Sequence, residues 1–206
     1  MNLPNKITML RIFLSFFIIL LLLFPFDATG ITIPQLFINE SLVVDIRYLV
    51  AGVLFVVASV TDFIDGYLAR KYNQVTDFGK MTDAIADKVL VNSILVILSS
   101  TGFISAIIPV IIVVRDIVVD SIKMIAGSKG NVVSAIKSGK LKTFCLMIGI
   151  TLTLFYNLPF ELFNLRVADA FLVIACVLSI MSAFQYYNSN KKYISMKSET
   201  VERIDV

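Results

Sequence analysis

Long apolar segments constrain the fold of this chain more than any other feature of its sequence. Most of them reach the roughly 18 to 20 residues that a helix needs to cross the hydrocarbon core of a bilayer. With 58% hydrophobic and only 16% charged residues, the chain also has too little polar surface to cover a water-soluble globule. The sequence therefore predicts an all-α membrane protein whose six transmembrane helices cover residues 9–26, 42–69, 78–99, 103–125, 141–158 and 167–187.

The positions of lysine and arginine predict the orientation of these segments. Basic residues cluster on one side, and only Arg47 and Arg166 fall on the other. We therefore expect both termini in the cytoplasm, with a transmembrane domain over residues 1–188 and a polar cytoplasmic tail over residues 189–206. A secretory signal peptide is the alternative for the first segment, because small residues follow its apolar stretch. The basic residues of the expected cytoplasmic side are Lys6, Arg11, Arg70, Lys71, Lys80, Lys123, Lys129, Lys137, Lys140, Lys142, Lys191, Lys192 and Lys197.

Aspartates gather at the cytoplasmic ends of the second and third segments, where an ionisable residue is costly and commonly marks a functional site. Asp62 and Asp65 are three residues apart, and Asp83 and Asp87 are four apart, so in helices each pair lies on one face. Across a tight turn, four carboxylates would meet and repel one another, and divalent cations with oxygen ligands would offset that repulsion. Two such cations can clamp both oxygens of a phosphoryl displacement. The residues therefore indicate a metal-assisted phosphoryl site.

The neighbours of these aspartates suit a phosphate-bearing ligand. Gly66, Ala69 and Gly79 continue the aspartate faces, and small residues let a ligand approach the backbone. Arg70 offers a planar fork for phosphate oxygens. The chain has no histidine, so proton transfer falls to a carboxylate, a lysine or a tyrosine. The alternative without a functional site is that the aspartates lie in loops or form ordinary ion pairs with Arg70, Lys71, Lys80 and Lys88.

Two motifs, DFIDGYLAR from Asp62 and GKMTDAIAD from Gly79, resemble the signature of the CDP-alcohol phosphatidyltransferases at all of its fixed positions. The resemblance implies a homodimeric six-helix membrane enzyme with its active site on the cytoplasmic side. It implies that the four aspartates Asp62, Asp65, Asp83 and Asp87 hold two Mg²⁺ or Mn²⁺ ions. It also makes Asp87 the general base that deprotonates an acceptor hydroxyl, which attacks CDP-diacylglycerol and releases CMP. The implied CDP-lipid contacts are Asn5, Thr8, Gly66, Ala69, Arg70, Thr76 and Gly79.

Basic residues of the fourth and fifth segments, and the N-terminal run LPNKITMLR, resemble the branch of this family that uses glycerol 3-phosphate as the acceptor. Glycerol 3-phosphate is a dianion that needs several cationic donors. Arg115 lies within the apolar run PVIIVVRDIVVD, where it is costly without a partner, and Asp116, Asp120 or the acceptor phosphate could be that partner. The expected acceptor contacts are Arg115, Lys123, Lys137, Lys140 and Lys142.

Other functions stay open at this point. A sister enzyme could use phosphatidylglycerol (a cardiolipin synthase), serine or inositol phosphate, and some of the lysines could instead serve only topology and attraction to anionic membrane lipids. A divalent-cation transporter also places acids in its spans, although here the acids crowd at one face. A catalytically silent scaffold is the third alternative. No feature predicts a nucleic-acid partner. Cys145 and Cys176 lie in apolar stretches, so we expect buried thiols and no disulfide.

Overall fold

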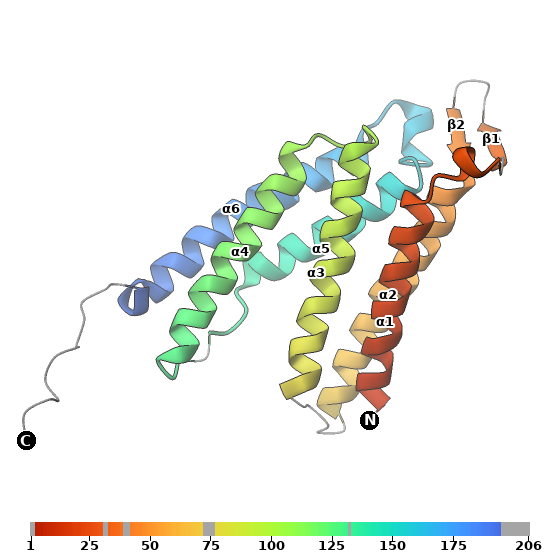
Figure 1. Ribbon diagram of the computed structural model, residues 1–206. Coiled ribbons are helices and arrows are strands. Elements are labelled where there is room, and N and C mark those ends of the chain that lie inside the picture. Colours follow the sequence, from red (N-terminus) through yellow and green to blue (C-terminus); the bar gives the residue numbers. More distant parts are fainter. Residues whose placement is uncertain (1–2, 31–32, 39–41, 72–76, 132, 195–206) are drawn as a thin grey trace, which may run out of the picture.

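The computed structural model describes residues 3–30, 33–38, 42–71, 77–131 and 133–194. Helices dominate this part of the chain, as the apolar segments predict, and they pack side by side as an elongated bundle (Figure 1). The helices of the described residues are α1 (Leu3–Leu23), α2 (Ile46–Lys71), α3 (Asp77–Ser100), α4 (Ile107–Ser128), α5 (Lys137–Leu154) and α6 (Val167–Ile194), with the short 3₁₀ helices η1 (Phe26–Thr29) and η2 (Phe160–Phe163).

A small antiparallel hairpin, β1 (Gln35–Ile38) and β2 (Leu42–Asp45), precedes α2 and corrects the expectation that the second helix begins at residue 42. Leu36 lies opposite Val44 in its register. Valine favours a pleated strand, and Asp45 then ends the strand and starts the helix. The Asp45 carboxylate accepts a hydrogen bond of 2.8 Å from the backbone N–H of Arg47, which satisfies a donor at the start of α2.

The ends of α5 and α6 also differ from the expected segments. α5 ends at Leu154, because the backbone of Tyr156 and Asn157 turns into the left-handed region with φ of 57° and 55°. α6 runs to Ile194, past the expected boundary between residues 188 and 189. Lys191 and Lys192 lie in its last turn, where cations are favourable, so the helix continues after the apolar pattern stops. Residues 195–206 of the expected tail lie outside the described residues.

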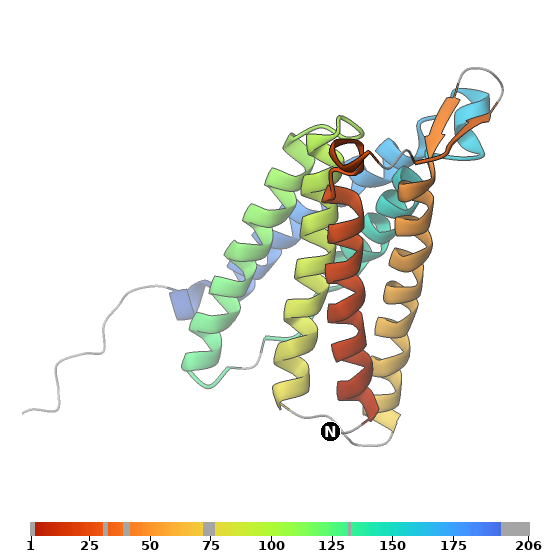
Figure 2. The same cartoon turned by 45° about the vertical axis from the view of Figure 1, so that its right-hand side comes forward.

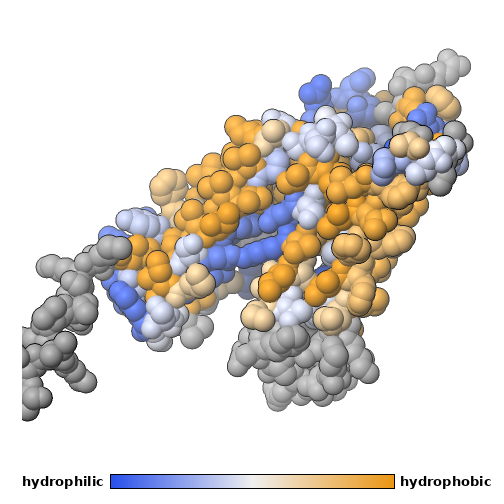
Figure 3. Space-filling view, viewed as in Figure 1, coloured by the Kyte–Doolittle hydropathy of each residue, from blue (hydrophilic) through white to orange (hydrophobic). Residues whose placement is uncertain are grey.

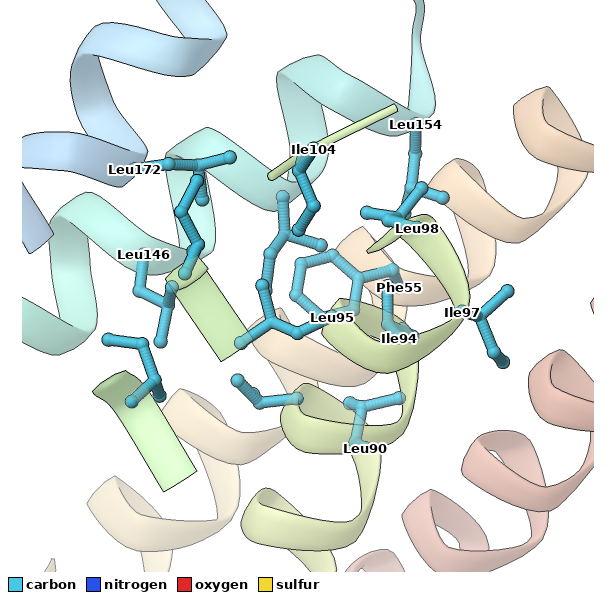
Figure 4. Packing of buried hydrophobic residues seen from close by; sticks show 14 of the residues in the cluster. Phe55, Leu90, Ile94, Leu95, Ile97, Leu98, Ile104, Leu146, Leu154 and Leu172 are labelled. Carbon is cyan, nitrogen blue, oxygen red and sulfur yellow. The ribbon is translucent and has the colours of Figure 1, made fainter. Parts of the chain in front are cut away.

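The core lies where α2, α3, α5 and α6 meet (Figure 4). Phe55, Ile94, Leu98, Leu154 and Leu172 are fully buried there. In a bilayer, apolar side chains gain little by leaving lipid for protein, so close van der Waals packing and polar contacts between helices contribute to holding the bundle together. The expected buried thiols are confirmed as free cysteines within this part of the chain.

Glycines set the closest helix contacts in the core. A Cβ added to Gly149 on α5 would lie 2.7 Å from Cδ2 of Leu172 on α6, and one added to Gly52 on α2 would lie 3.0 Å from Cε2 of Phe155. A side chain at Gly149 would force Leu172 to shift, and one at Gly52 would be in tight contact with Phe155. Glycine at these positions therefore permits the close packing seen here.

The outer faces of the helices are apolar, as expected for a protein in contact with lipid (Figure 3). Phe13, Val53, Val110 and Phe184, on four different helices, are each more than half exposed. By length and composition alone, α6 is the one helix of the described residues that is apolar enough to span a membrane, and α1 contains a shorter apolar stretch, Ile7–Leu23.

Charged side chains interrupt the apolar sequences of α3 and α4. α3 carries Asp83, Asp87 and Lys88, and α4 carries Arg115 and Asp116. Both views show α3 and α4 close together near the turn that joins them and farther apart toward their other ends (Figures 1 and 2). Hydrophilic surface lies between these two helices, framed by apolar surface (Figure 3).

Replacement of Gly149 by alanine tests the packing of α5 on α6. We expect Gly149→Ala to lower the free energy of unfolding by about 1–3 kcal/mol, because the new methyl group overlaps Leu172. Gly127→Ala is the matched control, since nothing lies within 4 Å of its added Cβ. Denaturant titration in detergent micelles measures both, and a Gly149→Ala variant as stable as the parent contradicts the packing described here.

Candidate active site

Arg11 of α1 joins the carboxylates of two other helices. Its side chain is 1% exposed, its Nη1 lies 2.7 Å from Oδ1 of Asp83 on α3, and it forms an ion pair with Asp62 on α2. Three helices therefore converge on one guanidinium. Arg11 was not among the cations that the sequence suggested as partners of the aspartates. It could have been found, because Arg11 lies among apolar residues and needs a partner there, as Arg115 does.

A second charged group is built on α4 and α5. The Arg115 guanidinium donates to Asp116 Oδ1 at 2.9 Å, and the Lys142 ammonium donates to both Asp116 oxygens at 3.0 and 3.2 Å. Lys142 is 4% exposed. Among the partners considered for Arg115, Asp116 is confirmed, whereas Asp120 pairs with Lys88 of α3.

Asp87 of α3 connects these two groups. It lies one turn after Asp83, and it interacts electrostatically with Asp83 and Arg11 of the first group and with Lys142 and Asp116 of the second. The structure therefore brings the described aspartates of the two motifs next to part of the expected acceptor cluster. A carboxylate in this position has a negative neighbour in one group and a buried cation in the other.

The expected acceptor residues divide into an inner and an outer set. Arg115 and Lys142 belong to the charged group around Asp116. Lys123 is exposed, but its Nζ lies 5.3 Å from the centroid of the Tyr186 ring, which also faces Arg115. Lys137 and Lys140 are exposed on the first turn of α5.

The expected CDP-lipid contacts are only partly described. Thr8 is buried on α1, and Gly66 and Gly79 lie on α2 and α3 at the same end of the bundle as Asp62 and Asp83. Thr76 lies outside the described residues, and so do the side chains of Asn5, Asp65, Ala69 and Arg70.

The donor chemistry of the first group fits a divalent cation. Asp62 and Asp83 approach one positive charge from two helices, and carboxylates are the oxygen ligands that Mg²⁺ and Mn²⁺ prefer. No group of three metal-ligating side chains occurs among the described residues, which leave out the Asp65 side chain. Arg11 occupies the central position and offsets the repulsion between the two carboxylates.

Comparison with known families places the chain in a class of membrane enzymes. The family described as CDP-alcohol phosphatidyltransferase matches residues 1–181, and the chain belongs to this family. The family is membrane-bound and generally depends on divalent metals. The motif resemblance noted in the sequence is thereby confirmed.

Several curated proteins are similar to this chain over most of its length. A protein of Bacillus subtilis is 38% identical over 92% of this chain and 95% of its own length. A protein of Rickettsia bellii is 33% identical over 93% and 97%, and one of Mycoplasma pneumoniae is 34% identical over 75% and 68%, respectively. All three carry the name CDP-diacylglycerol–glycerol-3-phosphate 3-phosphatidyltransferase.

Removal of the central cation tests the first charged group. We expect Arg11→Met to lower the free energy of unfolding of the metal-free protein by about 1–3 kcal/mol, because Asp62 and Asp83 then repel each other without compensation. The loss stays below that of a fully buried pair, since both carboxylates are partly exposed to solvent. Arg166→Met, at an exposed arginine near the start of α6, is the control. Equal stability of Arg11→Met and the parent would show that Arg11 does not hold the helices together.

Proposed function

We propose that this chain transfers the phosphatidyl group of CDP-diacylglycerol to glycerol 3-phosphate, giving phosphatidylglycerophosphate and CMP. The observation that carries the proposal is the position of Asp87 between a carboxylate group and a pair of largely buried cations. Family membership and the names of the relatives support the same reaction. Membership of a transferase family also argues against the cation transporter.

In this proposal the four aspartates Asp62, Asp65, Asp83 and Asp87 hold two Mg²⁺ or Mn²⁺ ions. When bound, these ions neutralise negative charge on the diphosphate and so lower the barrier to its cleavage. Arg11 keeps Asp62 and Asp83 close together on their two helices. The CDP-lipid is held by Asn5, Thr8, Gly66, Ala69, Arg70, Thr76 and Gly79.

The second charged group binds the acceptor. Arg115 and Lys142 bind the phosphate dianion of glycerol 3-phosphate, and Asp116 holds both cations in place. Lys123, Lys137 and Lys140, being exposed, attract the dianion and anionic lipid headgroups toward the site.

Asp87 performs the proton transfer. Its carboxylate takes the proton of the acceptor hydroxyl, and the resulting oxygen attacks the phosphorus atom that carries diacylglycerol. The bond from this phosphorus to the bridging oxygen of the diphosphate breaks, and CMP leaves with that oxygen. The buried Lys142 compensates the charge of Asp87 before the proton arrives.

The membrane arrangement that supports this chemistry is a multi-pass protein of the cell membrane. All six helices cross the bilayer, both termini are cytoplasmic and the site opens on the cytoplasmic side, which the clustering of basic residues on that side supports. Residues 1–188 form the transmembrane catalytic domain and residues 189–206 a cytoplasmic tail. The enzyme works as a homodimer among membrane lipids.

A sister enzyme with another phosphate-bearing acceptor is the second candidate. The largely buried pair Arg115 and Lys142 suits any phosphomonoester or phosphodiester alcohol, including inositol phosphate and phosphatidylglycerol, and it argues against serine.

Release of CMP by the purified protein in detergent–lipid micelles tests the proposed function. CDP-diacylglycerol and Mg²⁺ are supplied with glycerol 3-phosphate, inositol phosphate, phosphatidylglycerol or serine in separate reactions. We expect CMP release with glycerol 3-phosphate alone, and its loss on addition of a chelator. Release driven by another alcohol would keep the mechanism and replace the acceptor, whereas no release with any alcohol would contradict the proposal.

Substitution of Asp87 tests its role as the base. We expect Asp87→Asn to lower kcat by at least about 100-fold, because an amide cannot accept the proton, while binding of CDP-diacylglycerol changes little. Asp169→Asn, in the first turn of α6, is the matched control and retains activity. Near-normal turnover in Asp87→Asn would refute the assignment.

A further inference from the structure

Tyr186 of α6 lies against two of the cations assigned to the acceptor, yet no motif of the sequence includes it. It is 2% exposed. The Arg115 guanidinium carbon lies 5.7 Å and the Lys123 Nζ 5.3 Å from the centroid of its ring. An aromatic face attracts cations at such distances, so one buried ring holds two of the expected acceptor residues of α4.

The hydroxyl group of Tyr186 fixes the segment that leads into α5. It accepts a hydrogen bond of 3.1 Å from the backbone N–H of Ile136, the residue before the helix. A Cβ added to Gly139 would lie 3.5 Å from Nη2 of Arg115 and 3.9 Å from the Tyr186 ring. The first turn of α5 therefore rests directly on Arg115 and Tyr186.

Ser182, one turn before Tyr186, orients the Arg115 side chain. Its buried hydroxyl oxygen accepts hydrogen bonds from Nε at 3.2 Å and Nη2 at 2.8 Å of Arg115, and the hydroxyl donates to the carbonyl of Ser179. Asp116 accepts from the remaining nitrogen, Nη1. With these partners on three nitrogens, the guanidinium has a fixed plane and still keeps donors for a ligand.

A separate apolar cluster stabilises this arrangement. Tyr186 packs with Val119 and Ile122 of α4, and Val133 and Ile136 of the following segment lie against them. The cluster is distinct from the main core, so it holds α4, α6 and the start of α5 together at this end of the bundle. Ser182 and Tyr186 both lie beyond the residues that the family match covers.

We propose that Ser182 and Tyr186 are positioning residues that set the affinity for the anionic acceptor. They act through Arg115, Lys123 and the first turn of α5, and they leave the binding of CDP-diacylglycerol and the proton transfer to Asp87 unchanged. This inference rests on the proposed function, because it assigns the acceptor phosphate to the group around Arg115.

Steady-state kinetics of three variants test the inference, with each substrate varied in turn. Ser182→Ala removes both contacts to Arg115 within the same volume, and we expect a roughly tenfold rise in KM for glycerol 3-phosphate, the size expected for loss of a hydrogen bond to a charged group. Tyr186→Phe removes only the hydroxyl group and raises this KM less, and Tyr186→Leu removes the ring and raises it most. For all three variants, kcat and the KM for CDP-diacylglycerol stay within about twofold of the parent, whereas disrupted packing would move every parameter.

Tyr187→Phe is the matched control, because it removes an exposed hydroxyl group from the next residue and should change no parameter. If Ser182→Ala or Tyr186→Leu does not fold, the KM of Tyr186→Phe for glycerol 3-phosphate alone provides the test. An unchanged KM for glycerol 3-phosphate, or equal losses for both substrates, overturns the inference while the proposed function stands. Absence of glycerol 3-phosphate-dependent CMP release in the parent protein overturns the proposed function, and the inference with it.

Discussion

Ion pairs between helices hold the functional end of this bundle together. Arg11 joins α1 to Asp62 of α2 and Asp83 of α3, and Asp116 joins α4 to Lys142 of α5. Charges of this kind are costly where lipid surrounds the protein, and each is tolerated because an opposite charge lies within contact distance. The rest of the bundle, with its apolar outer face and glycine-mediated contacts, places these few side chains against one another.

Apolar packing and charged side chains lie close together along the same helices. In the main core, α2, α3, α5 and α6 pack through buried aliphatic and aromatic side chains, which reach Leu90 and Leu146, one turn from Asp87 and Lys142. A smaller cluster surrounds Tyr186, and the surface between α3 and α4 is hydrophilic (Figure 3). The main core and the ion pairs of the charged groups therefore both hold the helices together.

The helices were largely predictable, because the apolar character and the length of each segment are local properties of the sequence. The hairpin at β1 and β2 was not, since its strands are short and its pairing depends on contacts between segments. The continuation of α6 from Tyr187 to Ile194 was not predicted, because the prediction followed apolar residues and a polar sequence can continue a helix.

The aspartates of the two motifs were predictable from spacing, whereas their partners were not. Which cation meets which carboxylate depends on how helices far apart in sequence pack, and the sequence offers many lysines and arginines. Arg11 could have been found by the argument that was applied to Arg115, that a charge among apolar residues needs a partner. Ser182 and Tyr186 carry no such signal, because serine and tyrosine are ordinary residues in an apolar helix.

The proposed mechanism requires that the carboxylates of α2 and α3 and the cations of α4 and α5 belong to one site. Paramagnetic relaxation of the phosphorus nucleus of glycerol 3-phosphate by protein-bound Mn²⁺ measures this most directly, because the effect falls steeply with distance. We expect strong relaxation in the parent protein and its loss in Lys142→Met at the same concentrations, with Mn²⁺ binding retained. Glycerol 3-phosphate that binds to the parent without any Mn²⁺-dependent relaxation would place the two groups in separate sites and contradict the proposed mechanism.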